Sequence, residues 1–146
     1  MKNKVSEDGI SPAEWEVMRI IWTLGPVKTN TVIQVMNDKM NWQASTTKTF
    51  LARLKKKGFL TSKKEGREFC YQASIDENKA INEAVSRLFS NICEMCVGNT
   101  VNQLLENLEL SRRDIEKMQD TLAEKLKTAP EKIDCNCLPD EYCHHC

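Results

Sequence analysis

Apolar residues recur at helical spacing from residue 15 onward. Trp15, Met18 and Trp22 stand at i, i+3 and i+7, which predicts one buried face of an α-helix. The preceding Ser11-Pro12-Ala13-Glu14 has a capping serine, a proline at the first helical position and a glutamate that completes a capping box. Gly25-Pro26 then ends the pattern, so the first helix is expected between these signals.

Two further helices and a hairpin are predicted before residue 73. Helical periodicity covers residues 29–39 and 44–57, and Gly58 ends the second of these segments. Residues 59–62 and 68–73 are strand-like, and the polar residues 63–67 between them predict a hairpin turn. Three short helices followed by a basic-tipped hairpin is the element order of a winged helix-turn-helix domain.

Amphipathic helices are also predicted after the hairpin, over about fifty residues. Ser74-Ile75-Asp76-Glu77 and Ser111-Arg112-Arg113-Asp114 both have the pattern of a helix start. So few residues make a thin core by themselves, and the apolar stripes are expected to close against a second copy of the chain. The residues expected to mediate this dimerisation are Leu88, Leu104, Leu105, Ile115, Met118 and Leu122.

The predicted fold class is mainly α with a small β-hairpin. We expect an N-terminal extension at residues 1–9, a winged-helix DNA-binding domain at 10–73, a helical dimerisation region at 74–128 and a Cys/His metal-binding tail at 129–146. No apolar run approaches the roughly 18 residues of a membrane span, and the first residues lack the apolar core of a signal peptide. We therefore expect a cytoplasmic protein with no membrane partner.

The net charge of zero conceals an uneven distribution. Residues 1–73 carry 13 Lys and Arg against 7 Asp and Glu, whereas residues 74–146 carry 8 against 14. Between residues 45 and 67 there are eight basic residues and a single acidic one. A basic half joined to an acidic half indicates a nucleic-acid-binding module followed by a different one, although a charge run alone is more often a solvated face.

The third predicted helix has the composition of a recognition helix. One arc carries Thr47, Phe50, Leu51 and Leu54, and the opposite arc carries small hydroxyl, methyl and long cationic groups that suit base edges and phosphates in a major groove. Basic residues of the hairpin are expected to meet phosphates or a minor groove. The predicted DNA-binding residues are Ser45, Thr46, Lys48, Thr49, Ala52, Arg53, Lys56, Lys63, Lys64 and Arg67.

The last twelve residues, CNCLPDEYCHHC, hold four of the seven cysteines and both histidines. Reduced, clustered cysteines in a cytoplasmic protein favour metal binding over disulfides. Cys135, Cys137, Cys143 and Cys146 can supply a tetrathiolate zinc site, and His144 or His145 can replace one thiolate. Four thiolates can alternatively hold a compact pair of cuprous ions, because Cu(I) selects soft ligands.

The remaining cysteines are interpreted as structural. Cys93 and Cys96 have a CxxC spacing that is also used for metal or redox sites, but Ile92, Cys96 and Val97 continue an apolar stripe, which favours buried thiols. Cys70 lies in the second hairpin strand.

Several motifs resemble the penicillinase-repressor family from residue 10 to about residue 127. They are ISPAEWEVM at 10–18, IWTLG at 21–25, KTFLARL at 48–54 with KKG at 56–58, and KEGR at 64–67 before Tyr71. The CxC after the last helix resembles the CopY-type copper-responsive branch. That branch usually has CxC, four residues and CxC, whereas this chain has five residues and then CxxC.

The resemblance implies a cytoplasmic homodimeric repressor that binds a pseudo-palindromic operator with TACA/TGTA-type half-sites, upstream of copper-export genes. It implies Zn(II) in the repressing form and Cu(I) as inducer, often delivered by a copper chaperone. It also implies that the protein is not an enzyme, in agreement with the lack of a Gly-rich phosphate loop. Two alternatives are a zinc- or cadmium-responsive repressor of the same fold and a metal-storage or metal-delivery protein.

Overall fold

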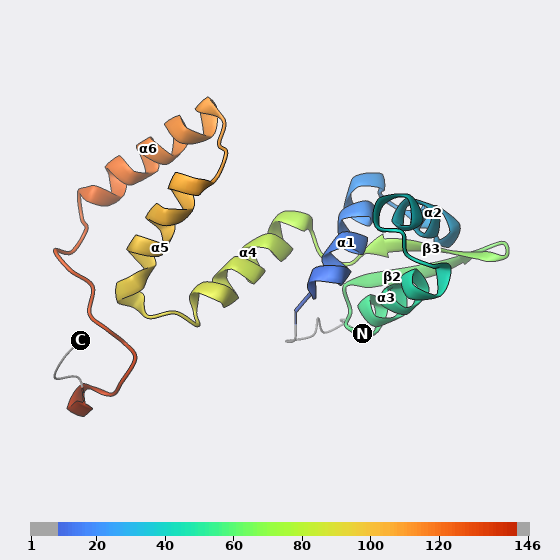
Figure 1. The fold of residues 1–146 in the computed structure, drawn as a ribbon, viewed down its shortest axis with the longest axis horizontal. Helices are drawn as coiled ribbons and strands as arrows, with labels where there is room; N and C mark the ends of the chain where they lie inside the picture. The colour runs from blue at the N-terminus through green and yellow to red at the C-terminus, as the bar shows by residue number, and fades with distance from the viewer. Residues whose placement is uncertain (1–8, 143–146) are drawn as a thin grey trace. The chain divides into compact units, whose positions relative to one another are not determined.

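The computed structural model describes residues 9–142 (Figure 1). They form two compact units, and the division falls within helix α4 (Glu77–Phe89), after Val85. In chain order the elements are α1 (Pro12–Leu24), β1 (Val27–Lys28), α2 (Thr29–Met40), α3 (Ala44–Lys56), β2 (Leu60–Glu65), β3 (Glu68–Ala73), α4 (Glu77–Phe89), α5 (Glu94–Asn107), α6 (Arg112–Leu126) and a 3-10 turn at Asp140–Tyr142. The fold is mainly helical with a small antiparallel sheet, which confirms the predicted winged helix-turn-helix class.

Helix α1 begins and ends at the predicted signals. The Glu14 amide donates to Ser11 Oγ at 3.3 Å, and the Ser11 amide donates to Glu14 Oε2 at 2.9 Å, which completes the capping box. At the other end Gly25 adopts φ +75°, a conformation that residues with a Cβ rarely adopt.

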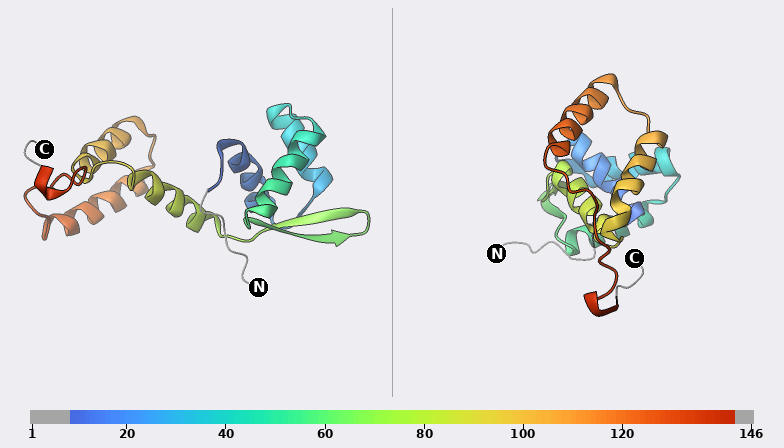
Figure 2. Two further views of the ribbon diagram at one scale, coloured as in Figure 1. Left: turned by 90° about the horizontal axis from the view of Figure 1, so that it is seen from below. Right: turned by 90° about the vertical axis from the view of Figure 1, so that its left-hand side faces the viewer.

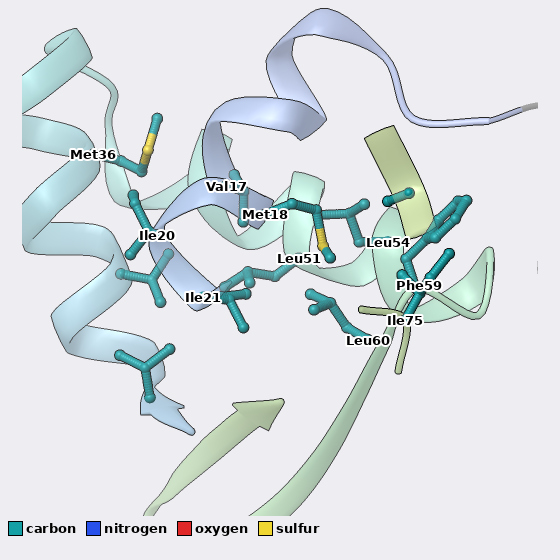
Figure 3. Packing of buried hydrophobic residues seen from close by; sticks show 13 residues of the cluster. Val17, Met18, Ile20, Ile21, Met36, Leu51, Leu54, Phe59, Leu60 and Ile75 are labelled. Atoms are coloured by element: carbon teal, nitrogen blue, oxygen red, sulfur yellow. The ribbon is translucent and has the colours of Figure 1, made fainter. Parts of the chain in front are cut away.

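One hydrophobic core holds the first unit together (Figure 3). Its interior combines side chains of α1, α2, α3 and the sheet, and Met18, Ile21, Met36, Leu51, Leu54 and Leu60 are its largest fully buried apolar members. Ile75 and Ala80 also belong to this core, so the start of α4 is packed against it. The indole N–H of Trp22 donates to the Ile75 carbonyl at 2.9 Å and adds a polar tie at the same place.

The sheet has three strands in the order β1-β3-β2, all antiparallel. The sequence predicted only the hairpin, because β1 has two residues and no alternation can be recognised over that length. The strand β2 also extends further than expected, to Glu65, so Lys63 and Lys64 are strand residues and the turn is reduced to Gly66-Arg67.

The second unit consists of the end of α4, helices α5 and α6 and the segment that follows. Ser111 caps α6 as predicted, because its hydroxyl accepts from the Asp114 amide at 3.1 Å. The Ser74–Glu77 pattern predicted the start of α4, and there the Asp76 carboxylate accepts from the Lys79 amide at 3.3 Å. No residue of α5 or α6 is buried.

No described helix is both long and apolar enough to cross a membrane.

Glu14 is the one buried charged residue among those that the structure describes, and its negative charge is balanced by Lys57. Its carboxylate is 2% exposed and accepts from Lys57 Nζ at 2.8 Å. Burial by itself raises the pKa of Glu14, but the hydrogen bonds from Lys57 and Ser11 and the charge of Lys57 outweigh that effect and lower it overall.

We expect Glu14→Gln to lower the free energy of unfolding at neutral pH by about 1–3 kcal/mol, because Lys57 loses its ionic partner and Ser11 a charged acceptor. Since the pKa of Glu14 is lowered on folding, its contribution is present above its unfolded value of about 4.3 and is lost as the pH falls through the folded value. Urea denaturation at pH 7 and at progressively lower pH measures both effects. Glu65→Gln, at an exposed position, is the control, and an equal loss in the two variants would contradict the assignment.

Candidate nucleic-acid interface and metal centre

A tight turn joins α2 to α3 and sets the helix-turn-helix geometry. Asn41 ends α2 in the left-handed region with φ 56°, which asparagine tolerates better than most residues. The Asn37 side-chain amide donates to the Trp42 carbonyl at 3.1 Å, and the Trp42 ring stacks on Phe50 with ring centroids 4.9 Å apart. The turn is thereby held to α3 by both polar and apolar contacts.

The two faces of α3 agree with the predicted arcs. Thr47, Leu51 and Leu54 are fully buried and Phe50 is half-buried. The opposite face is exposed and carries Ser45, Lys48, Thr49, Ala52, Arg53 and Lys56, whereas Thr46 is half-buried. The structure thus leaves a row of cationic, hydroxyl and methyl groups in solvent on a helix whose other side is fixed in the core.

Two of these exposed groups have local partners that fix their position. The Thr49 hydroxyl donates to the Ser45 carbonyl at 2.9 Å, which leaves its oxygen free to accept from a donor outside the helix. The Arg53 guanidinium lies over the Phe50 ring, 5.5 Å from its centroid.

The wing, which is the hairpin of β2 and β3 over residues 60–73, carries basic residues on both of its faces. Directly paired residues of an antiparallel sheet share a face, and successive residues alternate. Lys64 pairs with Phe69 and therefore shares the face of Leu60 and Ser62, whereas Lys63 pairs with Cys70 on the opposite face. Arg67 is exposed in the turn.

A shallow hollow lies between α3 and the face of the wing that carries Ser62 and Lys64. It includes one residue that the sequence prediction missed. Its lining is Ala52, Lys55, Lys56, Ser62, Phe69 and Tyr71. Lys55 is exposed and lies 5.9 Å from the centroid of the half-exposed Phe69 ring. The predicted arcs of this helix did not include Lys55, and only the position of the wing shows that it joins the cationic surface.

A second candidate site is formed by three thiols of the second unit. The sulfur atoms of Cys93, Cys135 and Cys137 all lie within 4.8 Å of one another. The Cys93 thiol donates to Cys135 Sγ at 3.6 Å, and the Cys137 amide donates to the same sulfur at 3.4 Å. Three sulfur donors at this spacing have the chemistry of a site for a thiophilic metal ion.

The cluster disfavours ionisation of the Cys137 thiol in the absence of a cation. Hydrogen bonds with Cys135 and then with Cys93, together with burial and the repulsion of neighbouring negative charge, raise the pKa of the Cys137 thiol to about 12. A bound cation reverses this effect, because it supplies the positive charge that three adjacent thiolates need.

The expected metal ligands are only partly within the described chain. Cys135 and Cys137 are brought together, and Cys143, His144, His145 and Cys146 lie outside the described residues. The interpretation of Cys93 and Cys96 as buried core thiols was wrong for this chain, because Cys93 is half-buried in the cluster and Cys96 is exposed. Cys70 is half-buried in β3.

The chain reverses its direction between α5 and α6 (Figure 2). Both helices present apolar side chains to solvent. A groove between them is lined by Val101, Leu105, Met118 and Leu122, among others. Of the residues expected to mediate dimerisation, Leu105 is half-buried and Leu88, Leu104, Ile115, Met118 and Leu122 are exposed.

The first unit is thus a winged helix-turn-helix of the DNA-binding class, and comparison with known proteins specifies the family. The profile of the penicillinase repressor family matches residues 10–124. The chain is 46% identical over 132 residues to an uncharacterized 16.5 kDa protein from the ptsI 3′ region of Latilactobacillus sakei, a match that covers 90% of each chain.

Two named repressors are also similar. Identity is 36% over 115 residues to the penicillinase repressor of Bacillus licheniformis, covering 79% of this chain and 90% of that one. It is 31% over 125 residues to the methicillin resistance regulatory protein MecI of Staphylococcus aureus strain N315, covering 86% and 100%. The chain belongs to the penicillinase repressor family, whose members are DNA-binding transcriptional repressors rather than enzymes.

The strand register predicts unequal roles for the two neighbouring lysines of β2. We expect Lys64→Ala to weaken operator binding about three- to tenfold and to reduce the slope of log affinity against log salt by about one, because Lys64 shares the face that meets α3. Lys63→Ala is the matched control and is expected to have the smaller effect. Fluorescence anisotropy with a labelled operator over a range of salt measures both, and a larger loss for Lys63→Ala would contradict the proposed face.

Proposed function

We propose that this protein is a metal-responsive transcriptional repressor that binds a pseudo-palindromic operator as a homodimer. The observation that carries the DNA-binding part is the α3 surface, where Lys48, Arg53 and Lys56 are exposed while Leu51 and Leu54 lock the opposite side into the core. Phosphate contacts by these cations position the helix, and Arg53 offers a bidentate donor for a guanine edge.

The wing adds contacts that strengthen binding without reading sequence. Lys64 lies on the face of the wing that meets α3, and Arg67 is at the turn of the wing. Lys55 of α3 lies next to Phe69 on the same face. A salt-dependent affinity for duplex DNA follows from the number of cations that meet phosphates. The proposed operator has TACA/TGTA-type half-sites, as the family resemblance implies, and the protein acts in the cytoplasm.

Dimerisation accounts for the exposed apolar surface of the second unit. Leu88 is 63% exposed and Leu122 is 56% exposed, and no residue of α5 or α6 reaches burial within its own chain. A second copy supplies the missing apolar partner, and two winged helices then read two half-sites of one operator.

The thiol cluster supports the metal-responsive part of the proposal. Zinc binds thiolates and imidazoles tetrahedrally, whereas cuprous ions are softer and take fewer thiolates per ion. In the proposed mechanism the zinc-loaded protein represses, and Cu(I), carried by a copper chaperone, displaces zinc and releases the operator of copper-export genes. This switch requires that the two metal forms of the tail interact differently with the rest of the dimer.

The alternative signal is zinc or cadmium excess, which the CxC-x5-CxxC spacing and the added histidines favour. A metal-storage or metal-delivery protein is a weaker alternative, because the cationic α3 surface has no part in it.

We expect Leu122→Glu to raise the dissociation constant of the dimer at least about tenfold, because burying a leucine is worth about 1.5–3 kcal/mol and a buried carboxylate adds a further cost. Sedimentation equilibrium measures the constant, and operator affinity is expected to fall with it. Leu24→Glu is the matched control, since Leu24 is a similarly exposed leucine of α1. A dimer that is unchanged by Leu122→Glu would place the interface elsewhere.

A metal titration of the operator complex tests the switch. We expect the zinc-loaded protein to bind a labelled palindromic duplex and to release it on stoichiometric addition of Cu(I), because thiolates select the softer ion. Cd(II) and excess Zn(II) are titrated in parallel, and release by these ions alone would favour the alternative signal. The double variant Cys135→Ser, Cys137→Ser is expected to lose the response, and Cys70→Ser, outside the cluster, to keep it. A double variant that responds as the parent does would remove the switch from the tail.

A further inference from the structure

We propose that Cys93 is a ligand of the tail metal, together with Cys135 and Cys137, so that the bound ion ties the segment after α6 to the start of α5. The inference rests on the proposed function in placing a metal at the tail cysteines. It adds a ligand from outside the tail and names the helix to which the metal couples that tail.

The sulfur positions fit a shared ion. A zinc–thiolate bond is about 2.3 Å, so two sulfurs bound to one tetrahedral ion lie about 3.8 Å apart. The sulfurs of Cys93 and Cys135 are 3.6 Å apart, and every pair in the cluster is within 4.8 Å. The three side chains can therefore close on one ion without a large movement of either segment.

The backbone around Cys93 is suited to a thiolate. Cys93 is the N-cap of α5, where unpaired amides and the helix dipole stabilise the negative charge of a metal-bound thiolate. This position is not sufficient by itself to make a site, but here it faces two other sulfur donors. The amide of Cys137, directed at Cys135 Sγ, provides a similar charge-stabilising donor within the tail.

A hydrogen bond outside the thiols holds the two segments together. The Asn136 side-chain oxygen accepts from the Glu94 amide at 3.0 Å, so the residue between the two tail cysteines satisfies one of the free amides at the start of α5. Asn136 is thus a positioning residue for the cluster, and it supplies the cap that the Cys93 side chain does not.

This ligand set differs from one confined to the tail. In a tail-only site Cys135, Cys137, Cys143 and Cys146 close a loop among themselves, and the ion has no direct bond to a helix. With Cys93 included, the metal becomes a cross-link between residues 42 positions apart. Exchange of zinc for an ion that prefers fewer thiolates then changes the restraint on α5.

The test compares Cys93→Ser with Cys96→Ser in the full-length protein under a phosphine reductant. Both substitutions replace a thiol near the start of α5, but Cys96 is exposed and lies outside the cluster. Zinc affinity is measured by competition with a chromophoric chelator. We expect at least a tenfold weaker affinity for Cys93→Ser and a change of less than about twofold for Cys96→Ser. In the Co(II)-loaded protein, the intensity of the thiolate-to-cobalt charge-transfer band should fall by the contribution of one thiolate in Cys93→Ser. It should stay unchanged in Cys96→Ser.

A measurement on the parent protein removes any dependence on how the variants fold. Bound zinc should slow alkylation of Cys93, Cys135 and Cys137 together, and leave Cys96 unchanged, as read by mass spectrometry of the digested protein. Alkylation of Cys93 at the same rate with and without zinc would overturn the proposal. So would parent-like zinc affinity in Cys93→Ser or an equal loss in Cys96→Ser.

The outcome for Cys93 is separable from the outcome for the proposed function. If the parent releases its operator with Cu(I) but zinc does not protect Cys93, the repressor stands with a tail-only site. If zinc protects Cys93 but no metal changes operator binding, the ligand assignment stands and the metal has a structural role.

Discussion

The packing of one side of α3 is the constraint on which the DNA-binding surface depends. Thr47, Leu51 and Leu54 are completely buried, so the helix can neither rotate nor slide without opening the core. The exposed side of α3 is therefore held in one orientation relative to the first unit. The backbone that carries its cationic side chains is already ordered, so it loses little conformational entropy when the helix binds a duplex. The same core fixes the wing, because Leu60 of β2 and Tyr71 of β3 pack against it. A single cluster of apolar side chains thus sets the relative position of both DNA-contacting elements.

Much of the first unit follows from local sequence signals. The capping box at Ser11 and Glu14, the helical spacing of Trp15 and Met18 and the glycine at position 25 determine α1 almost to the residue. The two faces of α3 follow from its periodicity in the same way. The strand β1 could not be predicted, because two residues carry no period and the strand exists only through its pairing with Tyr71 and Cys70. Lys55 was missed for a related reason, since its role depends on a strand that is distant in the sequence.

The thiol cluster shows a different limit of sequence reasoning. Spacing within CxC identified Cys135 and Cys137 as partners, but Cys93 is 42 residues from Cys135 and was interpreted as a structural thiol next to an apolar stripe. The stripe is real, yet α5 packs too lightly in its own chain for any of its residues to be buried. What brings Cys93 to the tail is the return of the chain after α6, together with the Asn136 cap on α5, and neither is written in the local pattern. Sequence periodicity identifies a face but does not say what covers it.

The light packing of α5 and α6 has a consequence for how the protein persists in a cell. A unit that buries none of the residues of its two main helices gains most of its folding free energy from association, so its stability rises with the concentration of its own chain. A freshly made chain at low copy number is then the form most open to proteolysis, and a chain that has met its partner is protected. The amount of protein and the extent of its association then depend on each other. Below the concentration at which chains associate, the protein is lost to proteolysis.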